Sequence, residues 1–166
     1  MINIKVICVG KLSESYLKQA QSEYLKRLNK YCKIEIIELN DTKVPQGNIS
    51  DIQKEQIKQK ECDEILKRLD KLTSNGRYSI FTLDLKGKEY NSIELSNLID
   101  DTSKYISSTI IFIIGGTLGL TDEVISKSQK LICFSKLTFP HQLIRIFLLE
   151  QIFRCFKILN NETYHH

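Results

Sequence analysis

The sequence has no tryptophan, only two prolines and no long apolar run. A membrane-spanning helix needs roughly 18 consecutive apolar residues, and no stretch of the chain reaches that length. The first ten residues are apolar, but they lack the basic start and the small-residue cleavage site of a signal peptide. These absences predict a cytoplasmic protein that does not associate with a membrane.

The cysteines form no recognisable pattern. There are five, an odd number, they are scattered along the chain, and no Cys-x-x-Cys pair occurs. A disulfide framework requires paired cysteines, and a structural zinc site requires closely spaced ones. The cysteine spacing therefore indicates a reducing compartment and predicts neither disulfides nor a bound metal.

The length of the chain favours a single domain. Its 166 residues are 42% hydrophobic, enough to bury a core, and we expect one domain spanning residues 1–166. The net charge of +4 is too small by itself to indicate a nucleic-acid partner. Basic side chains nevertheless concentrate in residues 1–33, among them Lys11, Lys26 and Arg27. Two interpretations stay open, a solvated helix face or a surface that faces the phosphates of RNA.

Hydrophobic periodicity predicts strands that alternate with helices. We expect strands at residues 2–9, 34–39, 78–83, 109–114 and 131–134, and helices at residues 14–30, 51–72, 92–105, 122–129 and 141–159. Ser13 is the expected N-cap of the first helix, and residues 84–88 are an expected turn. Such alternation predicts an α/β fold with a mostly parallel sheet and helices on both faces.

Three of the predicted strands end in loops that could form one pocket, because open α/β sheets bind ligands at the carboxyl ends of their strands. These loops follow Leu83, Ile114 and Phe134. The middle loop is the turn Gly115-Gly116-x-x-Gly119, where glycine lets a ligand approach the backbone closely. Its spacing differs from the dinucleotide-binding fingerprint, and no Gly-Lys-Ser/Thr follows, which excludes a P-loop.

The final predicted helix carries an arginine on its apolar side. At 100° per residue Arg145 falls among leucines and an isoleucine, with His141 one turn earlier on the same side. A buried arginine needs a partner, so Arg145 either extends its charged group to solvent, pairs internally, or serves an anion site or a subunit interface. Apolar residues cover most of the circumference of this helix, more than a small monomer buries easily, which predicts a symmetric dimer.

Several segments along the whole chain match the pattern of a known family. They are Ile4–Lys11, Glu23–Arg27, Thr82–Asp84 with Gly87-Lys88, Ile114–Leu120, Phe134–His141, the helix Arg145-x5-Gln151-x-x-Arg154-x-x-Lys157-Ile158, and the terminal Tyr164-His165. On these motifs the chain resembles the ribosomal RNA large subunit methyltransferase H family of the SPOUT superfamily. One departure is Leu118, where many relatives carry an acidic residue or Asn, so we expect no catalytic side chain at that position.

The resemblance implies a SPOUT-type C-terminal trefoil knot and a homodimer that packs through the C-terminal helix. It implies S-adenosyl-L-methionine (AdoMet) as methyl donor, no metal, and N3-methylation of one pseudouridine in 23S rRNA within the assembled ribosome. The family's AdoMet contacts carry over to Leu83, Gly115, Phe134, Ser135, Lys136, Leu137, Thr138 and Phe139. Gly116 and Gly119 join this predicted cofactor-binding set because they belong to the same turn.

Roles in the reaction follow from side-chain chemistry. We expect His165 to take the N3 proton and Tyr164 to stack on a base. Arg145 or Arg154 would hold a phosphate or the developing anion. His141, Lys11, Lys26 and Arg27 are the expected substrate-binding residues.

The C-terminal tail has three interpretations. It is a frayed end, the start of a purification tag, or part of an active site completed in trans around the AdoMet of the other subunit. Two functions other than 23S rRNA methylation also stay open. One is a ribosome-associated RNA-binding factor without catalysis, and the other is a SPOUT methyltransferase that acts on tRNA.

Overall fold

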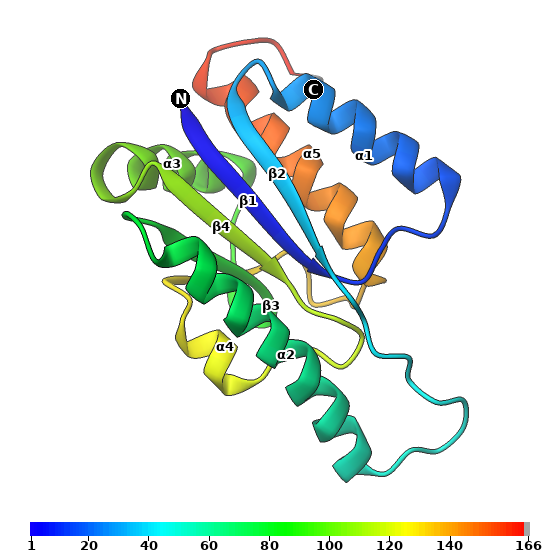
Figure 1. Cartoon of the computed structure of the whole chain (residues 1–166). Helices are drawn as coiled ribbons and strands as arrows, with labels where there is room; N and C mark the ends of the chain where they lie inside the picture. Colours follow the sequence, from blue (N-terminus) through cyan, green and yellow to red (C-terminus); the bar gives the residue numbers. More distant parts are fainter. Residues whose placement is uncertain (165–166) are drawn as a thin grey trace.

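Five strands rich in β-branched residues pair side by side in one sheet (Figure 1). They are β1 (Ile2–Val9), β2 (Cys32–Leu39), β3 (Ser79–Glu89), β4 (Thr109–Ile114) and β5 (Lys130–Cys133). The strand order is β2-β1-β4-β3-β5, and each pair of neighbours is parallel. This computed structural model, which describes residues 1–164, confirms the predicted α/β class and parallel sheet.

Helices cover both faces of the sheet, as predicted (Figure 1). One face packs against α1 (Ser15–Leu28), α3 (Ser92–Asp101) and α5 (His141–Leu159), and the other against α2 (Asp51–Thr73) and α4 (Asp122–Ser126). The side chains of the central strand β4 point alternately into two hydrophobic core clusters, one on each face of the sheet. Both faces are apolar and therefore have to be covered by helices, as in other parallel sheets.

The structure departs from the predicted helices in several details. Ser13 is not the N-cap of α1, because Glu14 holds that position and the Ser13 N–H and hydroxyl contact the side chain of Gln142 at 3.0 and 3.2 Å. The helix α3 gives way at its carboxyl end to a π-helical turn, η1 (Thr102–Ile106). The helix α4 ends at Ser126, three residues before the predicted end.

The predicted turn at residues 84–88 is also wrong in part. Strand β3 continues to Glu89, and Leu83 and Lys88 both lie opposite Ile132 of β5, so the segment between them loops out of register. A Cβ atom at Gly87 would lie 2.6 Å from the backbone of Ile132. Glycine therefore allows β3 to return to β5 after the excursion.

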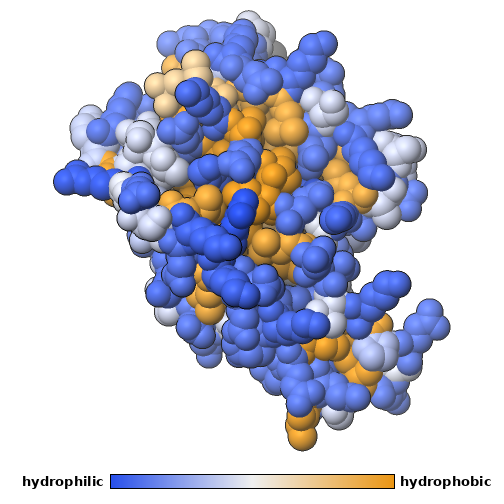
Figure 2. All heavy atoms as spheres, viewed as in Figure 1, coloured by the Kyte–Doolittle hydropathy of each residue, from blue (hydrophilic) through white to orange (hydrophobic). Residues whose placement is uncertain are grey.

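The surface of α2 is polar, in keeping with a helix that covers one side of the sheet. Ser50 and Gln53 form a capping box at its start, and hydrophilic residues dominate this face in the space-filling view (Figure 2). Within residues 1–164 no helix is both long and apolar enough to span a membrane. The trefoil knot that the resemblance implies stays a prediction.

Candidate functional site

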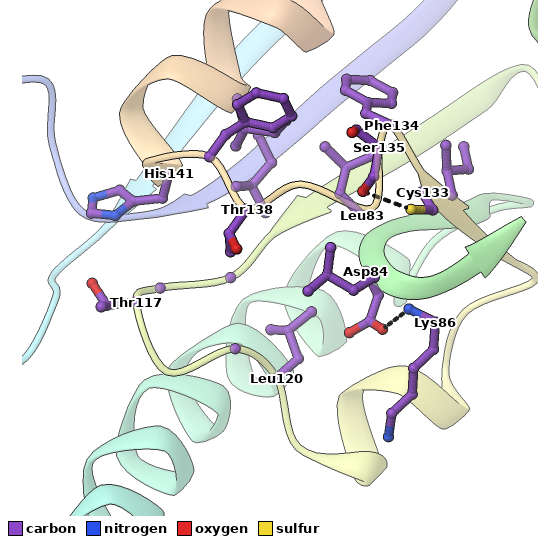
Figure 3. Close-up of a pocket in the computed structure, with 18 of the residues that line it drawn as sticks. Leu83, Asp84, Lys86, Thr117, Leu120, Cys133, Phe134, Ser135, Thr138 and His141 are labelled. Carbon is purple, nitrogen blue, oxygen red and sulfur yellow. Dashed lines mark hydrogen bonds between the residues drawn. The ribbon is translucent and has the colours of Figure 1, made fainter. Parts of the chain in front are cut away.

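One pocket at the carboxyl end of the sheet is lined by the excursion of β3 that begins at Leu83 and by the loops after β4 and β5 (Figure 3). The pocket has a volume of about 860 Å³ and is lined mostly by apolar side chains and glycine backbone. All the predicted cofactor-binding residues line it except Lys136, which is exposed in the same loop as its predicted neighbours. The meeting of the three loops was expected, because parallel strands place their carboxyl ends at one edge.

The glycine turn after β4 owes its shape to its residue types. Gly119 adopts a φ of +82°, which favours glycine, and its N–H donates to the carbonyl of Gly116 at 3.1 Å. A Cβ atom at Gly115 would lie 2.9 Å from the side chain of Leu120, which also lines the pocket. Any side chain at Gly115 would therefore displace the turn or narrow the pocket.

Several pocket residues escaped the sequence analysis, among them Asp84, Lys86, Thr117, Leu120, Cys133 and Ile144. Most are direct chain neighbours of predicted residues, so the signal that could have found them was adjacency within the three loops. Asp84 is the one carboxylate among the lining residues, and its side chain accepts the backbone N–H of Lys86 at 2.8 Å.

His141, predicted to bind substrate, lies in the pocket wall at the start of α5. It lies at the opposite end of the pocket from Asp84 (Figure 3). Burial lowers the pKa of His141 below its ordinary value, and Arg145 lowers it further, although Asp41 acts in the opposite direction. The imidazole is therefore neutral near pH 7 and is able to accept a hydrogen bond.

Arg145 is paired within the subunit, one of the alternatives that the sequence left open. Its side chain is 1% exposed, and Nη1 lies 2.5 Å from the Glu38 carboxylate at the end of β2. Nη2 donates to the carbonyl of Gly10 at 2.8 Å. These contacts tie α5 to the ends of β1 and β2, and Arg145 does not line the pocket.

The predicted catalytic residues Arg154 and Tyr164 lie together at the other end of α5. The Tyr164 hydroxyl donates to the Glu150 carboxylate, and Arg154 donates to the same oxygen at 2.8 Å. The Arg154 guanidinium also stands 4.2 Å from the centroid of the Tyr164 ring. Burial and the Glu150 contact raise the pKa of Tyr164 to about 12, so this hydroxyl is a proton donor near neutral pH. His165 lies outside the described residues.

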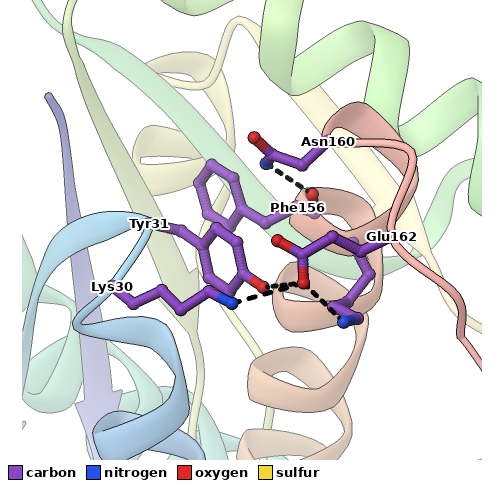
Figure 4. Close-up of polar contacts among 6 residues, drawn as sticks. Lys30, Tyr31, Phe156, Asn160 and Glu162 are labelled. Carbon is purple, nitrogen blue, oxygen red and sulfur yellow. Dashed lines mark hydrogen bonds and ion pairs between the residues drawn. The ribbon is translucent and has the colours of Figure 1, made fainter.

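A second cluster anchors the chain that leads to Tyr164 (Figure 4). The Glu162 carboxylate accepts hydrogen bonds from Lys157 at 2.6 Å, the Tyr31 hydroxyl at 2.8 Å and Lys30 at 3.3 Å. Donation by Lys157 and Tyr31 lowers the pKa of Glu162 to about 2. These contacts hold the tail, as far as Glu162, against α5 and the residues just before β2. A frayed end would make no such contacts.

The predicted basic substrate-binding residues divide between the two ends of α5. Lys11 is exposed. It follows Gly10, and a Cβ atom added at Gly10 would lie 3.1 Å from the His141 ring. Lys26 and Arg27 are exposed at the end of α1, and the Arg27 guanidinium is 5.8 Å from the Phe153 ring, which contacts Tyr164. No group of three or more His, Cys, Asp or Glu residues within residues 1–164 is placed to hold a metal ion.

Comparison with known proteins identifies close relatives over the full chain. A family model described as "Predicted SPOUT methyltransferase" matches residues 2–165. A protein from Clostridium tetani named ribosomal RNA large subunit methyltransferase H is 49% identical over 164 residues, which cover 99% of each chain. Proteins of that name from Clostridium perfringens and Clostridium acetobutylicum are 49% and 48% identical over the same share of each chain.

Proposed function

Because this chain belongs to the SPOUT methyltransferase family, and within it to the ribosomal RNA large subunit methyltransferase H family, we propose that it methylates N3 of a pseudouridine in 23S rRNA. The methyl donor is AdoMet, and the substrate is the assembled ribosome in the cytoplasm. The observation that carries the proposal is the meeting of the β3 excursion and the loops after β4 and β5 in one pocket.

The pocket suits AdoMet in size and in chemistry. Its volume of about 860 Å³ falls in the range of roughly 300–1,000 Å³ that is usual for small-molecule sites. Apolar side chains such as Leu83 and Phe134 would hold an adenosine group, and the glycine turn would let it approach the backbone. Asp84 complements the positive charge of AdoMet.

The chemistry required of the protein is orientation and proton removal. AdoMet supplies a methyl group that is already activated, and the family's reaction needs no metal. The residues of the chain must align the target nitrogen with that methyl group, accept the N3 proton and stabilise the negative charge that develops. His165 is the proposed proton acceptor, and Arg154, whose guanidinium stands 4.2 Å from the Tyr164 ring centroid, is the proposed group that holds the anion.

We propose that the site is completed by a second subunit. Tyr164 contacts Glu150, six residues after the pocket-lining Ile144, which at 1.5 Å per residue is roughly 9 Å along α5. Tyr164 is not among the residues that line the pocket of its own subunit. A symmetric dimer that packs through α5 would bring the tail of one subunit to the pocket of the other.

The dimer gives a direct prediction. Leu137 and Phe139, which line the pocket, and Phe147, which packs against Phe139, are 69%, 36% and 40% exposed, and we call them the apolar rim. Phe147→Glu should shift the protein from dimer to monomer at micromolar concentration, because it would place a charge in a buried contact. Sedimentation velocity measures this directly, and the matched control is Ile52→Glu, at a 72% exposed position on α2. A wild-type protein that sediments as a 19.3 kDa monomer would contradict the proposal.

Ile152, with an exposed fraction of 0%, belongs to the core, so a charged residue at that position would test the stability of the fold and not the dimer.

The two alternative functions are separated by substrate and by cofactor. A non-catalytic RNA-binding factor would show no thermal shift with AdoMet, and a tRNA enzyme would methylate free tRNA in vitro. We expect AdoMet to raise the melting temperature and expect methylation of intact 70S ribosomes only. Mass spectrometry of rRNA nucleosides from a deletion strain should show loss of one N3-methylpseudouridine. An unchanged nucleoside profile would overturn the proposed substrate.

A further inference from the structure

A buried carboxyl group lies behind the glycine turn. Glu61 of α2 is 4% exposed, and its Oε1 atom accepts the backbone N–H of Thr42 at 2.9 Å. Its Oε2 atom is buried without a hydrogen-bond partner. Among residues 1–164 no lysine, arginine or histidine forms an ion pair with Glu61, and burial raises the pKa of its carboxyl group.

Such a group costs stability. A carboxyl buried without a cation loses its hydration, and an apolar side chain of similar volume would leave the fold more stable. Buried polar atoms that lack partners are rare in folded proteins and therefore need an explanation. The surroundings of Oε2 supply one, because they belong to the methyl-donor pocket.

The carboxyl group of Glu61 packs closely against the glycine turn at Gly116. A Cβ atom at Gly116 would lie 2.5 Å from Glu61 Oε2 and 3.2 Å from a methyl group of Val9. The next residue of α2 contacts the other end of the loop, since the N–H of Thr121 donates to Cys62 Sγ at 3.3 Å. Two consecutive residues of α2 thus contact both ends of the loop that lines the pocket.

We propose that Glu61 is a positioning residue for the methyl donor. Held by the Thr42 N–H, its carboxyl group packs against Gly116 and keeps the backbone of the glycine turn in the shape that lines the pocket. Glu61 is not itself among the pocket-lining residues, so it acts through the turn. The inference rests on the proposed function, because AdoMet is the ligand whose affinity Glu61 sets.

The first test separates positioning from stability. Glu61→Leu fills the volume but cannot accept the Thr42 N–H, so the side chain is no longer anchored. We expect a melting temperature equal to or above that of the wild type, together with AdoMet affinity about tenfold weaker by calorimetry. Glu61→Gln keeps an acceptor oxygen and should bind AdoMet within about twofold of the wild type, which is the expected rescue by a conservative variant.

The second test is a double-mutant cycle on the contact itself. Gly116→Ala should weaken AdoMet binding because its methyl group meets the carboxyl group at 2.5 Å. Because Glu61→Ala removes that clash, Gly116→Ala should weaken AdoMet binding less in the Glu61→Ala protein than in the wild type. Strictly additive effects of the two changes would overturn the proposal, and the cycle does not depend on whether Glu61→Leu folds.

Steady-state kinetics on ribosomes complete the test. If Glu61 positions the methyl donor, Glu61→Leu should raise KM for AdoMet and leave kcat at saturating AdoMet unchanged. Unchanged KM and affinity in a folded Glu61→Leu protein would overturn the inference. A wild-type protein that binds no AdoMet in the same titration would instead refute the proposed function, so the two failures are distinguishable.

Discussion

Truncation after Asn160 should slow methylation of ribosomes by about 10²–10⁴-fold, the usual cost of losing a positioned proton acceptor. The deletion removes His165, the proposed proton acceptor, and Tyr164, whose hydroxyl contacts Glu150 in the structure. It also removes Glu162, whose contacts anchor the tail. AdoMet affinity and dimerisation should stay unchanged, because none of these residues lines the pocket or belongs to the apolar rim. Single-turnover kinetics, calorimetry and sedimentation measure the three properties.

A shorter truncation serves as the matched control. Ending the chain at Tyr164 removes only His165 and His166 and keeps the Glu162 and Glu150 contacts. If His165 takes the proton, this variant should lose nearly as much activity as the longer truncation. Full activity in the chain that ends at Asn160 would remove the tail from the mechanism. Arg154 would then be the stronger remaining candidate, since its side chain is 32% exposed and that of Arg145 only 1%.

Mixing variants tests whether the tail acts in trans. Chains truncated after Asn160 keep the AdoMet pocket, and Gly115→Val chains keep the tail. In a mixed dimer one complete composite site should form, so activity should recover above that of either homodimer. Absence of recovery in dimers shown to have exchanged subunits would argue that tail and pocket belong to one chain.

Gly115→Val should weaken AdoMet binding by up to about 100-fold while the protein stays folded. The new Cβ atom would lie 2.9 Å from Leu120 and 3.3 Å from the carbonyl oxygen of Gly119. Overpacking of this kind costs roughly 1–3 kcal/mol, up to about 100-fold in affinity. Gly115 has no positive φ, so its backbone accepts a side chain, and the clash with Leu120 lies at the edge of one core cluster. Calorimetry and circular dichroism together measure the effect.

Gly76→Ala is the matched control for this experiment. Gly76 lies between α2 and β3 with a φ of +115° and open space around it, so alanine there strains the backbone and lowers stability. It lies before β3 begins and therefore at the edge of the sheet opposite the pocket. We expect weaker thermal stability with unchanged AdoMet affinity. Unchanged affinity in the Gly115→Val protein as well would exclude the glycine turn from the cofactor site.

The sequence by itself determined the parallel sheet and the main parts of the pocket. The run Thr109–Ile114 is apolar at every position but the first, which only a strand covered on both faces requires, and the glycine turn follows it directly. The loops after Leu83 and Phe134 could be assigned to the same pocket because parallel strands share one carboxyl edge. Both inferences depend on local pattern and on a general rule of topology.

Only the tertiary structure decided which distant residues meet. Arg145 is 107 residues from Glu38, its ion-pair partner, and the sequence alone did not decide between internal pairing, an anion site and a subunit interface. The continuation of β3 to Glu89 depends on how closely Gly87 approaches Ile132. Glu61 gave no signal at all, since a glutamate on a polar helix is usually solvated. Each of these contacts depends on strand order and register, which bring together residues whose spacing along the chain carries no periodic pattern.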